Sequence, residues 1–101
     1  MNPAVGSVDV DADGVLRLVG HIGYANAGVM LPRGRAALAD GRVSRVDLSA
    51  LQAPDSATMA VLLVWAAEAS RSKRTLRVTG MPDGLRALIR LCDAEALLQA
   101  A

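Results

Sequence analysis

The segment from Val46 to Val64 constrains the fold of this chain more than any other part of its sequence. It reads VDLSALQAPDSATMAVLLV, so that a short apolar strand leads into a polar turn and then directly into a very apolar helix. The turn places Asp55 and Ser56 side by side where the helix begins. Such residues cap the free backbone N–H groups of a helix, and a helix N-terminus also favours a phosphate group. We therefore expect Ser56 to act as a cap, as a phosphate acceptor or as the centre of a docking surface.

The residues before this unit predict a hairpin of two strands and a first helix. Alternating apolar and polar residues indicate strands over 7–11 and 15–22, and the Asp13–Gly14 pair between them is typical of a hairpin turn. Residues 26–40 predict a helix. Its regular part is expected to begin near Pro32, because proline suits the first turn of a helix.

The residues after this unit continue the alternation of strands and helices. The second helix is expected from Ser56 to about Ser70, and residues 75–79 predict a strand parallel to the strand Val46–Leu48. A third helix is expected from Pro82, and a last helical turn within residues 94–100.

This order of elements predicts an α/β sandwich, in which a small mixed sheet of about four strands is covered by three to four helices. With 101 residues, of which 52% are hydrophobic, we expect a single domain over residues 1–101 with a core of about residues 7–98. A net charge of +1 argues against a nucleic-acid partner. The longest apolar run, residues 59–67, is much shorter than the ~20 residues of a membrane-spanning helix. We therefore expect a cytoplasmic protein without direct membrane insertion.

The second helix carries apolar residues on more than one side. At 100° per residue, five residues share the side that is expected to face the sheet, namely Met59, Leu62, Leu63, Ala66 and Ser70. Three apolar residues lie on the other side, namely Val61, Val64 and Trp65. Two interpretations stay open here: these three residues form an interface with a partner protein, or the first or third helix covers them.

The sequence offers little for catalysis or for metal binding. No G-x-S-x-G surrounds Ser56, and a nucleophilic serine needs a base. The single histidine, His21, lies on the edge of a predicted strand and is expected to be solvated or satisfied structurally. The single cysteine, Cys92, is expected to pack inertly in the core on the third helix, and one Cys with one His supplies too few metal ligands. We therefore expect no enzymatic activity, no catalytic residue, no metal and no cofactor.

The residues Val46-Asp47-Leu48-Ser49, followed by Asp55-Ser56-Ala57-Thr58 and the apolar helix, resemble the core motif of STAS domains. The order of elements from about Ser7 to Leu98 is similar to that fold throughout. The resemblance implies that Asp47 is a strand-end acid, that Asp55 is the acid of the turn and that Ser56 is a switch or docking hydroxyl. We expect Ser56, Asp55 and Thr58 together to form the phosphorylation or docking site. Thr58 departs from the pattern, because many anti-sigma-factor antagonists have glycine there. We expect its branched side chain to restrict approach to Ser56, which weakens the reading of Ser56 as a kinase substrate.

Two branches of the family fit the motif. In anti-sigma-factor antagonists the motif serine is a phosphorylation switch, whereas in Mla-type ABC phospholipid transporters the small STAS subunit binds the cytosolic ATPase. The segment from Val78 to Leu88, VTGMPDGLRAL, is closer to the transporter branch. We therefore expect a non-enzymatic subunit that supports an ABC-type ATPase in maintaining outer-membrane lipid asymmetry. It would lie on the cytosolic side of the inner membrane through this partner. The alternative is an anti-sigma-factor antagonist regulated by phosphorylation at Ser56.

Overall fold

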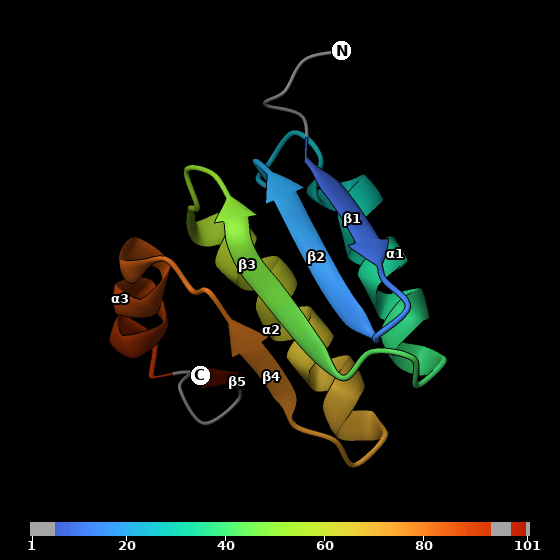
Figure 1. The fold of residues 1–101 in the computed structure, drawn as a ribbon. Coiled ribbons are helices and arrows are strands. Elements are labelled where there is room, and N and C mark those ends of the chain that lie inside the picture. The colour runs from blue at the N-terminus through green and yellow to red at the C-terminus, as the bar shows by residue number, and fades with distance from the viewer. Residues whose placement is uncertain (1–5, 94–97, 101) are drawn as a thin grey trace.

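The computed structural model describes residues 6–93 and 98–100, and within this part of the chain five strands form one sheet in the order β1-β2-β3-β4-β5 (Figure 1). The strands are β1 Ser7–Val10, β2 Val15–Gly20, β3 Arg45–Leu51, β4 Leu76–Thr79 and β5 Leu98–Ala100. The helices of the same part of the chain are α1 Ala27–Ala39, α2 Ser56–Arg71 and α3 Asp83–Leu91.

The sheet is mixed, as the sequence predicted. The β1 strand pairs antiparallel with β2 through the expected turn, where Gly14 adopts a φ of 81° that favours glycine. The β2, β3, β4 and β5 strands pair parallel to one another, and a helix connects each to the next. Parallel neighbours require such crossover connections. The elements therefore follow the α/β pattern that the sequence indicated.

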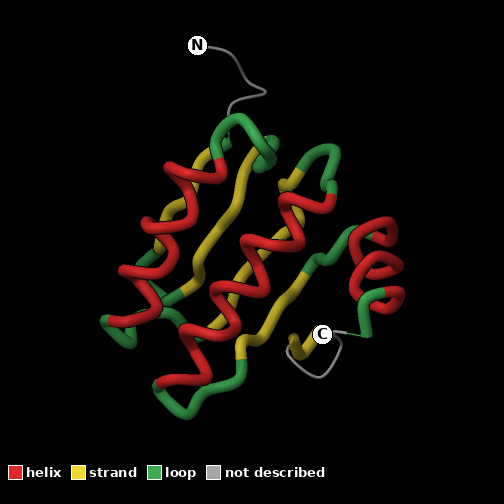
Figure 2. Tube along the Cα trace, turned by 180° about the vertical axis from the view of Figure 1, so that it is seen from behind, coloured by secondary structure: helices red, strands yellow, loops and turns green. Residues whose placement is uncertain are grey.

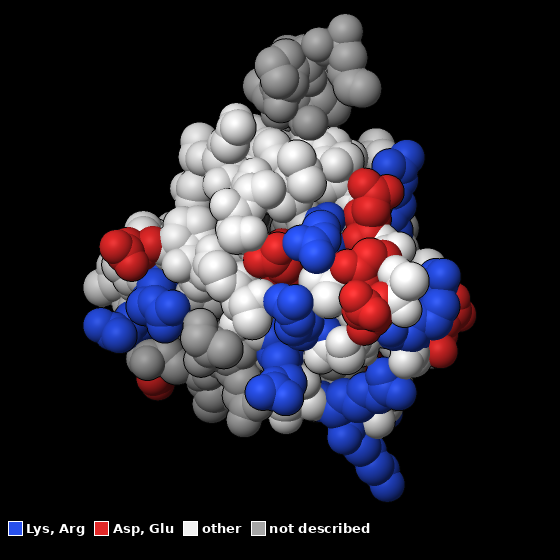
Figure 3. All heavy atoms as spheres, in the orientation of Figure 1, with Lys and Arg blue, Asp and Glu red and all other residues white. Residues whose placement is uncertain are grey.

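The α1 and α2 helices cover one face of the sheet, and α3 lies at its flank beyond β4 (Figure 2). Side chains that alternate along the strands are buried on the helix side, for example Leu16 and Leu18 of β2 and Val46 and Leu48 of β3. The opposite face is not covered by these helices. Figure 3 shows basic and acidic side chains intermingled on the right of that open face.

Three local expectations are wrong. Pro32 lies inside α1 and does not begin it, because the helix starts at Ala27. Residues 98–100, expected in a last helical turn, form β5 instead, because the backbone of β4 offers a free edge for parallel pairing; residues 94–97 lie outside the described residues. Cys92 is exposed and does not belong to the core, because α3 ends at Leu91.

The side-by-side packing of α1 and α2 decides which residues of α2 are buried. The indole of Trp65 is fully buried, and its Nε1–H donates to the carbonyl oxygen of Leu31 in α1 at 2.9 Å. Val61 is also buried, whereas Val64 is 36% exposed. The interpretation of Val61 and Trp65 as an exposed interface is therefore wrong, and the alternative that the first helix covers them is confirmed.

The expected sheet-facing side of α2 also needs a correction. Leu62 and Ala66 are buried as predicted, and Met59 and Leu63 are half-buried. Ser70, however, is exposed. The buried set of α2 is wider than one stripe because the helix contacts both the sheet and α1.

Gly34 of α1 makes the close approach of the two helices possible. A Cβ atom at this position would overlap the Cε2 and Cζ2 atoms of Trp65, whereas a Cβ atom at Gly28 of the same helix would meet open space. We expect Gly34→Ala to lower the free energy of unfolding by about 1–3 kcal/mol through overpacking. Gly28→Ala should leave it unchanged or raise it by up to about 1 kcal/mol, because alanine favours helix. Urea denaturation of both variants checks this, and equal effects would contradict the account of the helix contact.

Candidate functional site

The turn between β3 and α2 is held by a reciprocal pair of hydrogen bonds. Asp55 is the N-cap residue of α2, and its carboxylate Oδ1 accepts from the Thr58 backbone N–H at 3.0 Å. The Asp55 backbone N–H in turn donates to the Thr58 hydroxyl at 3.1 Å. This arrangement is a capping box, which satisfies two backbone donors that the helix itself leaves without partners.

The Thr58 side chain also ties this turn to the preceding loop. It is fully buried, and its hydroxyl donates to the backbone carbonyl of Ile22, which lies between β2 and α1. Thr58 is therefore a structural residue and not a docking residue. The expectation that its branched side chain restricts approach to Ser56 is wrong, because the side chain points into the protein.

Ser56 is the first residue of α2, and it is exposed. Within residues 6–93 and 98–100, no hydrogen bond of the structure involves its hydroxyl, and Asp55 supplies the cap. The expectation that Ser56 caps the helix is therefore wrong. Its hydroxyl instead faces solvent at the positive end of the helix, where a partner or a phosphate group can reach it.

His21 lies close to this turn, which the sequence analysis did not find. Its Nδ1 is 3.3 Å from the carbonyl oxygen of Gln52, and its Nε2 is 3.9 Å from Oδ2 of Asp55. The loop after β2, which carries His21, lies close to the loop after β3, which carries Asp55. The reason is that β2 and β3 are parallel neighbours, so that both loops lie at the same edge of the sheet. Both ring nitrogens are directed at these groups, and the arrangement does not give Ser56 a base.

A hollow of about 300 Å³ opens between the first turns of α1 and α2. Its lining is mainly apolar and comprises Tyr24, Ala27, Leu31, Ser56, Ala57, Ala60, Val61 and Val64. Tyr24 is 92% exposed, although aromatic side chains usually bury most of their surface. We name the exposed part of this lining, Tyr24, Ser56, Ala60 and Val64, the docking surface. The sequence analysis missed Tyr24, and its only signal was a lone aromatic residue before the first helix.

Asp47 does not belong to this site. It lies inside β3, which continues to Leu51, and so it is not a strand-end residue. Its side chain is on the open face of the sheet, where Oδ2 accepts from Arg17 Nη1 at 2.9 Å and from the Ser49 hydroxyl at 3.0 Å. Burial raises the pKa of the Asp47 carboxyl, but the hydrogen bonds from Ser49 and the charge of Arg17 outweigh this and lower it. Asp47 therefore helps to order the open face.

Among residues 6–93 and 98–100, no three His, Cys, Asp or Glu side chains are grouped so that they could hold a metal ion. In the same part of the chain, each helix is too short or too polar to span a bilayer.

Comparison with known proteins identifies the family. A family model described as Mlab, STAS domain matches residues 6–99, and the chain therefore belongs to the STAS family. STAS domains are protein-interaction modules and are generally not enzymes. No curated protein matches the sequence.

Solved structures confirm the fold. A Thermotoga maritima protein described as a putative anti-sigma factor antagonist is 15% identical with a TM-score of 0.73, over 94% of this chain and 84% of that one. The Bacillus protein SpoIIAA in its phosphorylated form is 11% identical with a TM-score of 0.69, over 96% and 91% of the two chains. SpoIIAA in its unphosphorylated form, also an anti-sigma factor antagonist, is 11% identical with a TM-score of 0.67, over 86% and 83%. The STAS fold that the sequence motif implied is thereby confirmed.

The capping box predicts different effects on stability for substitutions of Asp55 and of Ser56. Asp55→Ala removes the acceptor for the Thr58 N–H, and we expect it to lower the free energy of unfolding by about 0.5–2 kcal/mol. Ser56→Ala removes a hydroxyl that makes no such bond, and we expect a change within about 0.5 kcal/mol. Chemical denaturation measures both. A larger loss in Ser56→Ala than in Asp55→Ala would show that the serine is the cap.

The same carboxylate predicts a dependence of stability on pH. The hydrogen bond from the Thr58 N–H holds the pKa of Asp55 below its ordinary value, although burial acts in the opposite direction. Its contribution to stability is therefore complete above the unfolded-state pKa of about 3.9, and it is lost as the pH falls through the lower folded-state value. Asp55→Asn keeps a capping oxygen, so we expect near-normal stability at pH 7 and a shallower loss in acid. Urea titrations from neutral to acid pH test this, and profiles of equal slope would refute it.

Proposed function

We propose that this chain is a STAS subunit that binds the cytosolic ATPase of an ABC phospholipid transporter and supports its role in outer-membrane lipid asymmetry. On this proposal it is one domain that lies on the cytosolic side of the inner membrane through its partner. The observation that carries the proposal is the docking surface, an apolar patch with a hollow at its centre and no catalytic machinery beside it. The family description, Mlab, supports the transporter branch.

The chemistry of the docking surface suits a protein partner. Tyrosine is enriched at the energetic centres of interfaces, and a large exposed side chain next to a hollow allows two surfaces to interlock. Ala60 and Ser56 are small, so that a partner can approach the α2 backbone closely. Val64 continues the apolar surface along the same helix. We propose that the partner inserts an apolar side chain into the hollow while Tyr24 packs against the partner.

The two residues at the rim of the hollow test this proposal. Tyr24→Ala and Val64→Glu should each weaken binding to the ATPase by at least about tenfold, because one removes an anchor and the other places a charge in an apolar contact. The matched control is Val19→Glu, since Val19 is 43% exposed but lies on β2 and does not line the hollow. Affinity purification with the native ATPase subunit, followed by titration of the purified pair, measures the effect.

Thermal melting of each variant distinguishes a loss of binding from a loss of folding. Each variant is melted in isolation, and we expect melting temperatures close to that of the wild-type chain because the substituted side chains are exposed. Wild-type affinity in both Tyr24→Ala and Val64→Glu would contradict the docking surface. Recovery of a small kinase, in place of an ATPase and a permease, would contradict the proposed partner.

The alternative function, an anti-sigma-factor antagonist regulated at Ser56, has its own supporting observation. The exposed Ser56 hydroxyl lies at the N-terminus of α2, and the fold is shared with SpoIIAA, whose structure exists in phosphorylated and unphosphorylated forms. A phosphate group on Ser56 would add up to about two negative charges next to Asp55 and so alter docking. Intact-mass analysis of protein from the native host separates the two functions. A large fraction carrying one phosphate at Ser56 favours the alternative, and an unmodified chain favours the transporter subunit.

A further inference from the structure

The docking surface carries an exposed aromatic ring and an unfilled hollow next to each other. Tyr24 lines the hollow of about 300 Å³, yet it is 92% exposed, so its ring lies at the rim and does not fill the hollow. Pockets of this size hold small organic molecules, and a phenol ring is smaller than most of these. One surface therefore presents both a projecting ring and a hollow that can receive such a ring.

Hydrogen bonds of Asn26 fix the loop that carries Tyr24. The Asn26 Oδ1 accepts from the Gly23 N–H at 3.0 Å, and its Nδ2 donates to the His21 carbonyl at 2.8 Å. The Gly23 carbonyl in turn accepts from the Ala27 N–H at 2.8 Å. A residue whose backbone is already ordered loses little conformational freedom on binding, and a tyrosine side chain has only two torsions to fix. The backbone of Tyr24 is therefore in place before a partner binds.

Twofold symmetry allows two copies of this surface to fit each other. An axis that passes between the ring and the hollow places the ring of each copy over the hollow of the other, so that two identical contacts form and the pair is closed. We infer that the docking surface also binds a second copy of this chain, with Tyr24 of each copy in the hollow of the other. This inference rests on the docking surface of the proposed function, and the dimer hides that surface from the ATPase.

The lining of the hollow suits a tyrosine in particular. The ring would lie against Leu31, Ala60 and Val64, which are apolar. A buried tyrosine hydroxyl needs a hydrogen-bond partner. Ser56 lines the same hollow, and its hydroxyl makes no hydrogen bond to the part of the chain that the structure describes. The Ser56 hydroxyl is therefore available to the hydroxyl of Tyr24 from the second copy.

The charges near the docking surface do not oppose this pairing. Among the described residues, those that line the hollow carry no charge. Asp55 lies beside them, and the N-termini of α1 and α2 offset its negative charge with about half a positive charge each. The whole chain has a net charge of +1, so that two copies repel each other only weakly.

The area of the contact indicates a weak dimer. Two aromatic side chains bury about 150–250 Å² each, and the walls of the two hollows lose a similar area, which gives about 600–1,000 Å² in total. Specific, stable interfaces bury at least about 1,200 Å². The dimer is therefore reversible, and an ATPase that binds the same surface more tightly displaces the second copy.

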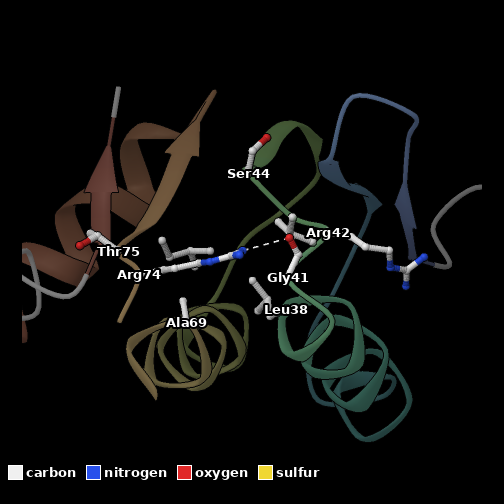
Figure 4. Close-up of a pocket in the computed structure, with 9 residues that line it drawn as sticks. Leu38, Gly41, Arg42, Ser44, Ala69, Arg74 and Thr75 are labelled. Carbon is white, nitrogen blue, oxygen red and sulfur yellow. Dashed lines mark hydrogen bonds between the residues drawn. The ribbon is translucent and has the colours of Figure 1, made fainter. Parts of the chain in front are cut away.

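A second hollow, of about 500 Å³, lies where α1 and α2 end, and it is a poorer receptor for the ring (Figure 4). The Arg74 side chain lies across it, and its Nη1 donates to the Gly41 carbonyl at 3.1 Å. An entering ring would have to displace this hydrogen bond. Insertion there would also join two different surfaces and produce open chains of copies, whereas the docking surface produces a closed dimer.

Sedimentation equilibrium of the whole chain alone, from about 10 µM to about 2 mM, tests the self-association. We expect the average mass to rise from that of one chain towards that of two and not beyond. Over the same range, the backbone amide resonances of residues 24–31 and 56–64 should shift with concentration. The mass of one chain throughout, or a mass of more than two chains, would overturn the inference. Because no ATPase is present, such a result would leave the proposed function standing.

Substitutions locate the contact. Tyr24→Ala removes the ring and Ala60→Glu places a charge in the hollow, and each should weaken dimerisation by at least about tenfold. The matched control is Leu91→Glu, because Leu91 is 83% exposed but lies at the end of α3 and does not line the hollow. It should change the dimerisation by less than about twofold. Thermal melting shows whether each variant folds, and Tyr24→Ala decides the question if Ala60→Glu does not. Wild-type dimerisation in Tyr24→Ala, or its loss in Leu91→Glu, would overturn the inference.

Discussion

The contact between the indole of Trp65 and the backbone of α1 at Gly34 is the interaction on which the rest of this structure depends. It brings two helices side by side on one face of the sheet, and the Nε1–H bond to the Leu31 carbonyl sets their relative position. The chain has 2% aromatic residues, so this indole fills a core that is otherwise aliphatic. Because the hollow of the docking surface lies between the first turns of the same helices, its shape follows from this contact.

Hydrogen bonds of Thr58 and Asp55 fix the candidate site at the start of α2. Thr58 is buried, yet its hydroxyl links the cap of α2 to the loop that carries Tyr24 through the Ile22 carbonyl. Asp55 caps the N-terminus of α2, so Ser56 does not cap the helix and its hydroxyl faces solvent. Because Asp55 and Thr58 form the capping box, the Ser56 hydroxyl is accessible to a partner or to a phosphate group. The same arrangement suits both branches of the family, which is why the partner must be identified by binding.

The sequence predicted what is decided locally. The hairpin turn at Gly14, the apolar helix after Asp55 and the alternation of strands and helices all follow from spacing and turn chemistry. It did not predict the burial of Trp65, because periodicity shows which residues share a side of a helix but not how many neighbours that helix has. The strand containing Asp47 is longer than expected because its end pairs with Val19 and Gly20 of β2, a partner distant in sequence. For the same reason the approach of His21 to the turn could not be predicted from spacing.

The central claim is that a partner binds at the N-terminal end of the α1–α2 pair, beside Ser56. Hydrogen–deuterium exchange of the chain, free and in complex with its native ATPase, tests this claim most directly because it maps the contact without altering any residue. The account predicts slower exchange in residues 24–31 and 56–64 of the bound chain, with little change on the open face of β2 and β3. Protection confined to that open face would contradict the account.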